Sequence, residues 1–364
     1  MTATTNTMSS GTSSPHSNSK SGFIIGPLAD LVLIIGAPLI SLVIAGSLFS
    51  LQDSAFTVSI GGTSRDLRQV FVTVFINAHL FLVYFRSHAN EAIFRQYPWR
   101  FTVVPLVVFV AGGLSPAALG ITGLIVVWWD VYHSSLQTFG FGRIYDAKMK
   151  NDPAIGRRLD YWMNLLVYAG PVLAGAHFIQ HIEISMRDLE FLATGKDQWS
   201  ELFLQRTPDF LLKHQTYLAA AILSVGIPFV AYYFYSYYAL SQKGYRVSWQ
   251  KVWLMVITST VSIYCWGFHS FIDAFWVMNF FHALQYFAIV GFAEHENLSR
   301  VFRATRFSHG AILAMIWVIG FCFCYGLWSS YFASGSWSIS MTMTTSIMHF
   351  WYDGFIWSVK KKQV

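Results

Sequence analysis

Four histidines, His79, His133, His282 and His349, each interrupt a long apolar segment of the sequence. Neutral imidazoles are ligands for iron, copper and zinc, and a carboxylate commonly joins them where iron activates dioxygen. Ionisable side chains are costly inside a lipid bilayer, so those found there usually face the protein interior or a water-filled cavity. The four histidines therefore predict a buried metal site.

Carboxylates accompany two of these histidines at helical spacing. Asp130 precedes His133 by three residues, and Asp353 follows His349 by four. Residues three or four apart share one face of a helix. A histidine that binds a metal usually donates its second N–H to a carboxylate, amide or carbonyl group. We therefore expect Asp130 and Asp353 either to bind the metal or to orient its imidazoles.

His282 also has polar neighbours on its own helical face. Asn279 lies three residues before it, and Gln285 and Tyr286 lie three and four residues after it. We expect Tyr286 to act at the metal site as a hydrogen-bond donor or an electron relay.

A second group of candidate ligands lies nearer the opposite membrane surface. His177 and His181 form an HxxxH pattern, and His269 and Asp273 lie in the next predicted hairpin. Two imidazoles on one helical face can bind a metal. Near the interface the same side chains can simply be hydrated, so both interpretations stay open for this group.

These residues must be positioned by membrane helices, because the composition is that of a membrane protein. Hydrophobic residues make up 54% of the 364 residues and charged residues only 12%. A spanning helix needs roughly 20 predominantly apolar residues, and about ten segments qualify. The expected segments are 29–50, 68–86, 101–114, 117–138, 160–182, 215–240, 249–271, 273–294, 309–332 and 338–358.

The distribution of basic residues predicts the orientation of these helices, because cytoplasmic loops collect Lys and Arg. With the N-terminus inside, the long loop 183–214 on the opposite side has six acidic residues against four basic ones. The basic residues expected in cytoplasmic loops or at the C-terminus are Arg86, Arg95, Arg100, Arg143, Lys148, Lys150, Arg157, Arg158, Lys243, Arg246, Arg300, Arg303, Arg306 and Lys360 to Lys362. The net charge of +6 is thereby explained by topology and by contact with anionic lipids, without nucleic-acid binding.

The predicted fold is an all-α, polytopic membrane bundle of about ten helices with both termini in the cytoplasm. Residues 1–24 are rich in Ser, Thr and Asn and are expected to form a disordered tail. Residues 25–359 are expected to form a single transmembrane domain, and residues 360–364 a basic cytoplasmic end. In a bacterium, the protein would lie in the cytoplasmic membrane.

The leading functional hypothesis is a metal-dependent membrane oxidoreductase of the oxygenase, hydroxylase or desaturase type. Non-haem iron is the expected cofactor, with copper or haem as alternatives. A site within the bilayer favours a lipid-soluble substrate, and a cytoplasmic electron donor could dock on the basic loops. The sequence does not predict an oligomeric state.

Two other classes of function use similar residues. A haem or quinone electron-transfer protein would pair the four histidines across helices. A proton-coupled transporter would use buried His and Asp residues as a relay, although the sequence has no inverted repeat. Membrane desaturases and hydroxylases carry several HxxxH and HxxHH patterns, whereas this chain has a single HxxxH. The motifs therefore assign it to no family.

Overall fold

The computed structural model describes residues 22–48, 57–60, 62–175 and 198–357. This part of the chain contains twelve α-helices, short π and 3-10 segments, and one two-stranded hairpin, so the all-α prediction is confirmed. The elements are α1 (Pro27–Ala29), η1 (Asp30–Ile35), α2 (Ala37–Ile44), η2 (Gly46–Leu48), β1 (Thr57–Ile60), β2 (Thr63–Asp66), α3 (Leu67–Ser87), α4 (Glu91–Phe94), α5 (Pro98–Leu114), α6 (Pro116–Lys148), α7 (Arg157–Ala174), α9 (Gln198–Gln242), α10 (Trp249–Phe268), α11 (Phe271–Val301), η3 (Ala304–Arg306), α12 (Gly310–Tyr331) and α13 (Gly335–Ile356).

Several long apolar helices indicate a multi-pass membrane protein, but the predicted number of ten spans is wrong. Within the described residues, five helices are long and apolar enough to cross a membrane, and a bent pair at the N-terminal end would make six. The five are α3, residues 213–242 of α9, α10, α11 and α12. Helices α6, α7 and α13 coincide with predicted spans but carry many inward-facing polar side chains, and α5 has only 17 residues.

The N-terminal predicted span is bent rather than straight. Residues 27–35 and 37–44 meet at 53°. The buried carboxylate of Asp30 accepts hydrogen bonds from the backbone N–H groups of Ile24 and Ile25, at 2.6 and 2.8 Å, and from the Tyr145 hydroxyl at 2.9 Å. Ile24, which was assigned to the disordered tail, is thus buried in the core. The remainder of that tail up to residue 21 lies outside the described residues.

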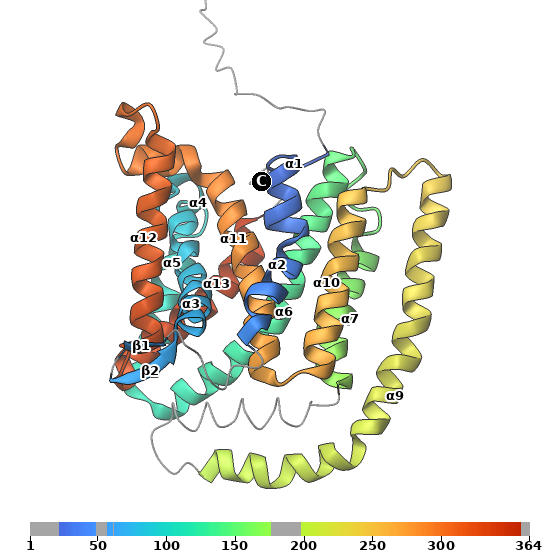
Figure 1. The fold of residues 1–364 in the computed structure, drawn as a ribbon, viewed down its shortest axis with the longest axis horizontal. Coiled ribbons are helices and arrows are strands. Elements are labelled where there is room, and N and C mark those ends of the chain that lie inside the picture. Colours follow the sequence, from blue (N-terminus) through green and yellow to red (C-terminus); the bar gives the residue numbers. More distant parts are fainter. Residues whose placement is uncertain (1–21, 49–56, 61, 176–197, 358–364) are drawn as a thin grey trace, which may run out of the picture.

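Four helices surround the centre of the bundle in a closed ring. Helix α3 packs against α11 and α13, and α6 packs against the same two helices from the other side. Figure 1 shows these helices together with their neighbours: α12 packs beside α3, α5 packs against α13, and α10 and α7 lie beside α6. Each of the four helices carries one of the histidines singled out in the sequence.

Side-chain caps fix the start of three of these four helices. Asp66 accepts from the backbone N–H of Arg68 at 2.8 Å, before α3. Ser115 and Ser270 accept from N–H groups in the first turns of α6 and α11, at 3.2 and 3.3 Å. Such caps satisfy donors that the helix itself leaves unpaired, which fixes the residue at which each helix begins.

Helix α12 approaches α3 closely at one glycine. A Cβ atom on Gly326 would lie 2.3 Å from the carbonyl oxygen of Val74 and 2.9 Å from the backbone nitrogen of Ala78. Small residues let membrane helices come together at backbone distance. Because Ala78 directly precedes His79, this contact sets the position of the part of α3 that carries the histidine.

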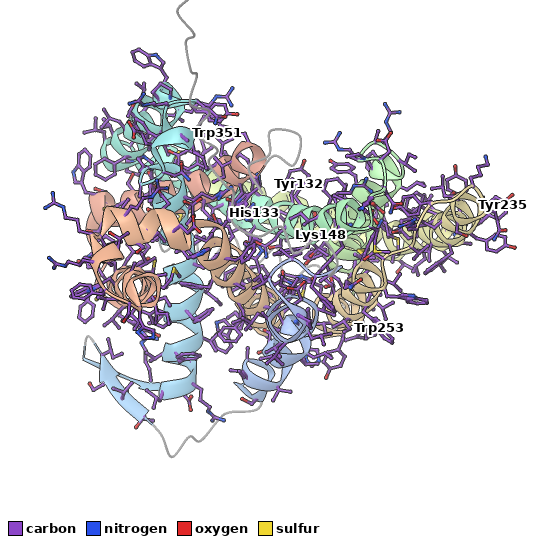
Figure 2. All side chains as sticks on the ribbon, turned by 90° about the horizontal axis from the view of Figure 1, so that it is seen from above. Tyr132, His133, Lys148, Tyr235, Trp253 and Trp351 are labelled. Carbon is purple, nitrogen blue, oxygen red and sulfur yellow. The ribbon has the colours of Figure 1, made fainter. Side chains whose placement is uncertain are left out.

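Helix α9 stands at the edge of the molecule (Figure 1). It begins at Gln198, so residues 198–214 are helical and not the long loop that the sequence predicted; residues 176–197 lie outside the described residues. Seen from above, Figure 2 places His133 inside the bundle, and Tyr235 on α9 and Trp253 on α10 at its periphery. Tyr235 and Trp253 are exposed, as expected of lipid-facing aromatic side chains.

Candidate metal centre

The four histidines converge at one point inside the ring of helices. The ring of His79 on α3 lies 5.1 Å from that of His282 on α11 and 4.8 Å from that of His349 on α13, measured between centroids. His133 on α6 completes the arrangement, at 4.8 Å from His282 and 4.9 Å from His349. All four side chains are buried. The four imidazoles therefore form a closed quadrilateral in the order of the helices that carry them.

Most of the ring nitrogens in this quadrilateral have no hydrogen-bond partner among the described residues. These atoms are Nε2 of His79, Nε2 of His133, and both nitrogens of His282 and of His349. Nδ1 of His79 has a backbone partner, the carbonyl oxygen of Ile76. A buried polar atom left unpaired costs about 1–3 kcal/mol, so six such atoms together would be a severe cost for a purely structural cluster.

The distances between ring centroids are compatible with imidazoles around one small ion, although each group of donor atoms within 4.8 Å of one another contains at most three of the histidines. A ring nitrogen bound at about 2.1 Å places its ring centroid roughly 3.2 Å from the ion. Depending on geometry, neighbouring centroids would then lie about 4.5–5.2 Å apart and opposite ones about 5.2–6.4 Å apart. The observed neighbours lie at 4.8–5.1 Å, and the opposite pair His282 and His349 at 6.0 Å.

Ligand atoms meet closely enough for metal binding in two overlapping triads. The donor atoms of His79, His282 and His349 lie within 4.8 Å of one another, as do those of His133, His349 and Asp353. Two ligands bound to one ion at about 2.1 Å can be no more than about 4.2 Å apart, so small side-chain movements would suffice. The triads share His349, which places this histidine at the centre of the donor set.

Asp353 contributes the carboxylate of the second triad. Its Oδ1 accepts hydrogen bonds from the Tyr286 hydroxyl at 2.9 Å and from Nε1 of Trp357 at 3.0 Å. Its Oδ2 lies 3.7 Å from Nε2 of His133 and 3.8 Å from Nε2 of His349. One carboxylate oxygen is thus held by donors while the other faces the imidazoles. The ring of Tyr286 also lies 4.5 Å from that of His349.

A buried ion pair lies beyond Asp353. The guanidinium group of Arg86 is 3.6 Å from the centroid of the Trp357 ring and forms a salt bridge with Glu294. Asn90 and Asn297 donate further hydrogen bonds to the same Glu294 carboxylate. The sequence assigned Arg86 to a cytoplasmic loop, and this was wrong, because its charge is neutralised inside the bundle. The position of a basic residue near a helix end does not show from the sequence alone whether its side chain contacts water or a carboxylate.

Asp130 takes a different position from that of Asp353. Its buried carboxylate accepts a hydrogen bond of 2.9 Å from Nδ2 of Asn279, and within the described residues it belongs to neither triad of candidate ligands. Gln137 and Gln285 likewise bond to each other, at 2.9 Å. Gln137 also donates to the carbonyl oxygen of His282 at 3.1 Å. These side chains link α6 to α11 next to the histidines.

The second group of predicted ligands is not assembled in the part of the chain that the structure describes. His177 and His181 lie outside the described residues. His269 is the C-cap residue of α10, and its ring centroid lies 4.5 Å from that of Tyr264. Asp273 accepts a hydrogen bond of 2.7 Å from the Ser270 hydroxyl and thereby takes part in the cap of α11. Both described residues have local structural roles.

A second buried charged cluster was missed by the sequence analysis. Nζ of Lys251 lies 2.8 Å from both Asp146 and Asp160, and Arg143 lies 2.8 and 2.6 Å from the same two carboxylates. Arg143 had been assigned to a cytoplasmic loop, which was wrong for the same reason as for Arg86. The only sequence signal was the spacing of Arg143 and Asp146, three residues apart on one helix. We call these four residues the charge quartet.

The charge quartet holds α9 to the rest of the bundle. The hydroxyl groups of Tyr233 and Tyr237 on α9 donate to Oδ1 of Asp160, at 2.9 and 2.6 Å. Arg143 follows His133 by ten residues on α6, which is roughly 15 Å along the axis. The quartet is therefore a separate structural cluster and not part of the candidate metal centre.

Comparison with known protein families, curated proteins and solved structures finds no match to this chain.

Proposed function

We propose that the protein is a membrane-embedded, metal-dependent oxidoreductase of the oxygenase, hydroxylase or desaturase type. In this proposal His79, His133, His282 and His349 hold the metal, and Asp353 either completes the ligand set or orients its imidazoles. The substrate is a lipid-soluble molecule, because the bundle that contains the site has several long apolar helices.

The observation that carries this proposal is the set of unpaired ring nitrogens. A cluster that only held helices together would pair its imidazoles with hydrogen-bond partners, as Asn279 pairs with Asp130. Six ring nitrogens of the four imidazoles have no such partner among the described residues. A metal ion would give up to four of these nitrogens a partner at once.

The nature of the donors favours iron. Two histidines and one carboxylate, as in the triad of His133, His349 and Asp353, are the ligands of many non-haem iron oxygenases. Iron held in this way with an open coordination position activates dioxygen. Copper also accepts imidazole ligands, so the donor set ranks iron first without excluding copper.

Haem is less well supported. A haem would need its flat ring between two axial imidazoles, with other side chains kept clear of its plane. Here each histidine has two further imidazoles within 5.1 Å of it, between ring centroids. The close packing therefore favours a single ion over a macrocycle.

Metal analysis of the purified protein tests the proposal. We expect about one iron per chain and no Soret band in the optical spectrum. His282→Ala should abolish metal retention while the protein stays folded. His295→Ala on the same helix should retain the metal, because His295 is exposed and bonds to the carbonyl oxygen of Phe292. Full metal occupancy in the His282 variant would refute the site.

We further propose that both termini face the cytoplasm. The end of the bundle with α4 and η3 lies opposite the β1–β2 hairpin (Figure 1). Basic residues at the end with α4 and η3, such as Arg300 and Arg303, support a cytoplasmic location for that end. A cysteine replacing Asp152, between α6 and α7, should react with a membrane-impermeant reagent only in opened cells. A cysteine replacing Gly62, in the hairpin, should react in intact cells, and the reverse pattern would invert the topology.

A further inference from the structure

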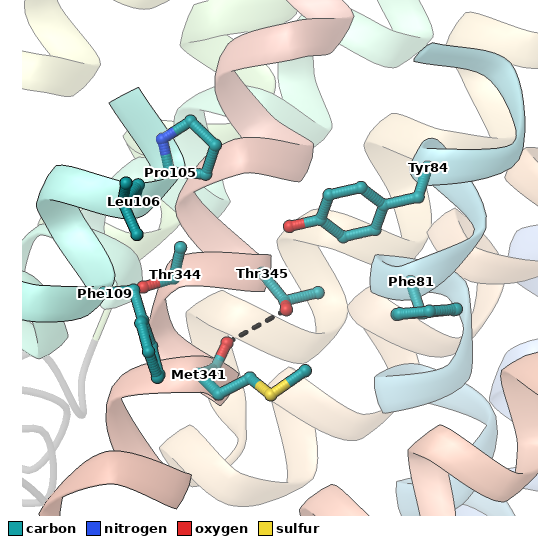
Figure 3. Close-up of a pocket in the computed structure, with 8 residues that line it drawn as sticks. All are labelled: Phe81, Tyr84, Pro105, Leu106, Phe109, Met341, Thr344 and Thr345. Atoms are coloured by element: carbon teal, nitrogen blue, oxygen red, sulfur yellow. Dashed lines mark hydrogen bonds between the residues drawn. The ribbon is translucent and has the colours of Figure 1, made fainter. Parts of the chain in front are cut away.

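Helices α3, α5 and α13 enclose a cavity of about 520 Å³ (Figure 3). This volume lies within the range of roughly 300–1,000 Å³ that is typical of ligand pockets. Its walls are mostly apolar, with Phe81 on α3, Leu106 and Phe109 on α5, and Met341 on α13. Three lining side chains carry a hydroxyl group, namely Tyr84 on α3 and Thr344 and Thr345 on α13. We call this cavity the α5 pocket.

The α5 pocket opens toward the outside of the bundle. Two of its lining residues, Leu106 and Met341, are 60% and 43% exposed. Helix α5 is apolar around most of its circumference, so this exposed surface suits the hydrocarbon part of a bilayer. A molecule dissolved in the membrane could therefore enter the pocket sideways without crossing water.

One of the hydroxyl groups in the pocket wall, that of Thr344, is buried and unpaired among the described residues. Thr344 is 5% exposed, and its Oγ1 has no hydrogen-bond partner among the described residues. The neighbouring Thr345 differs, because its hydroxyl donates to the carbonyl oxygen of Met341 at 2.9 Å. An unpaired hydroxyl in an apolar cavity is a costly feature unless a ligand supplies its partner.

The α5 pocket shares two helices with the candidate metal centre. Phe81 lies two residues after His79 on α3, and Thr345 lies one helical turn before His349 on α13. On a straight helix, Thr344 is then roughly 7.5 Å from His349 along the axis. The α5 pocket therefore borders two of the four helices that carry the histidines.

We infer that the α5 pocket binds a neutral lipid that has a long hydrocarbon chain and one hydroxyl or carbonyl oxygen. The apolar walls take the chain, and the Thr344 hydroxyl bonds to the oxygen. That this lipid is the substrate rests on the proposed function, whereas its binding does not depend on the metal. The described residues that line the pocket include no charged side chain, which favours a neutral ligand over a fatty acid anion or a phospholipid head group.

Photolabelling of the full-length protein in nanodiscs tests this inference. The probe is a long-chain primary alcohol with a diazirine on its chain, and the comparison probe is the same diazirine on the parent alkane. We expect saturable labelling by the alcohol on peptides of α5 and α13. Thr344→Val should weaken this labelling about five- to tenfold, the effect of one lost hydrogen bond.

Ser346→Ala is the matched control on α13, because it removes a hydroxyl that donates to the carbonyl oxygen of Thr342 and does not line the pocket, so it should change the labelling little. Leu106→Trp should fill the pocket and abolish labelling, whereas Leu223→Trp, on the exposed face of α9, should not. His133→Ala protein should be labelled like the wild type, so the result does not depend on metal content.

Three outcomes would overturn the inference. These are equal saturable labelling by the alkane probe, unchanged labelling of the Thr344→Val protein, and labelling that does not saturate and spreads over lipid-facing helices such as α9. Each would identify the α5 pocket as ordinary lipid-exposed surface.

Discussion

The hydroxyl group of Tyr286 donates a hydrogen bond of 2.9 Å to Oδ1 of Asp353 and so joins α11 to α13 beside the histidines. The other carboxylate oxygen lies 3.7 Å from His133 and 3.8 Å from His349. The carboxylate therefore has one oxygen fixed in place and the other directed at the candidate ligands. This is the arrangement expected of a group that binds a metal or orients its imidazoles.

Asp353→Asn should weaken metal binding roughly 10- to 100-fold and leave the protein folded, because the amide keeps the shape of the side chain and removes its charge. Metal content after equilibration with a graded chelator measures this. Asp273→Asn, at the start of the same α11 that carries His282, is the control and should bind metal normally. Unchanged metal affinity in the Asp353 variant would make this residue a link between helices only.

Tyr286→Phe should have a smaller effect than Asp353→Asn on metal affinity. It removes one donor to Oδ1 and keeps the ring, while Trp357 still donates to the same oxygen. If Tyr286 acts through the carboxylate, the double variant should bind metal no more weakly than Asp353→Asn alone. Additive losses in this double-mutant cycle would show that Tyr286 acts on the site by another route.

Lys251→Met should destabilise the folded protein by about 3–5 kcal/mol, because it leaves two buried carboxylates facing Arg143 alone. Thermal unfolding in detergent would reveal the loss. Adding Asp146→Asn should restore much of the stability, since charge balance returns. Lys148→Met serves as the matched variant, as Lys148 is exposed on the same helix as Asp146 and should not affect unfolding. An equally stable Lys251 variant would contradict the structural role of the charge quartet.

Gly326→Ala should lower stability by about 1–3 kcal/mol and reduce metal occupancy, because the new methyl group must push α12 away from α3. The displaced segment of α3 carries His79. Gly320→Ala on the same helix is the control. A Cβ atom at this position would have no neighbouring atom within 4 Å, so the variant should change neither stability nor metal occupancy. Equal behaviour of the two variants would mean that the contact at Gly326 does not position His79.

The sequence analysis grouped four histidines that converge in the structure, whereas the number of membrane spans that it predicted was wrong. The four histidines could be grouped in advance because each interrupts an apolar segment, and burial of an imidazole there restricts it to the interior. The helix that carries His349 nevertheless fails as an apolar span, because a helix inside a bundle can carry Ser340 and Ser346 toward its neighbours. Hydropathy measures composition and not the direction in which a side chain points.

The buried ion pairs were beyond sequence analysis for a related reason. Lys251 and Asp160 lie on different helices, and nothing in their local sequence indicates that they meet. The same limit applies to Asp130 and Asp353, which look equivalent beside their histidines. The structure separates them, since Asn279 occupies the carboxylate of Asp130 whereas Oδ2 of Asp353 faces the imidazoles. The role of each carboxylate is therefore set by contacts with other helices, which its local sequence does not show.

The order of the four histidines along the chain has a consequence for biosynthesis. His79, His133 and His282 are synthesised well before His349, which belongs to both candidate triads. Translation must therefore proceed past α13, and that helix must pack against α3 and α6, before the ligand set is complete. Under the proposed function, metal insertion would then be a late event in assembly, and a ribosome-stalled chain that ends before α13 should reach the membrane without acquiring metal.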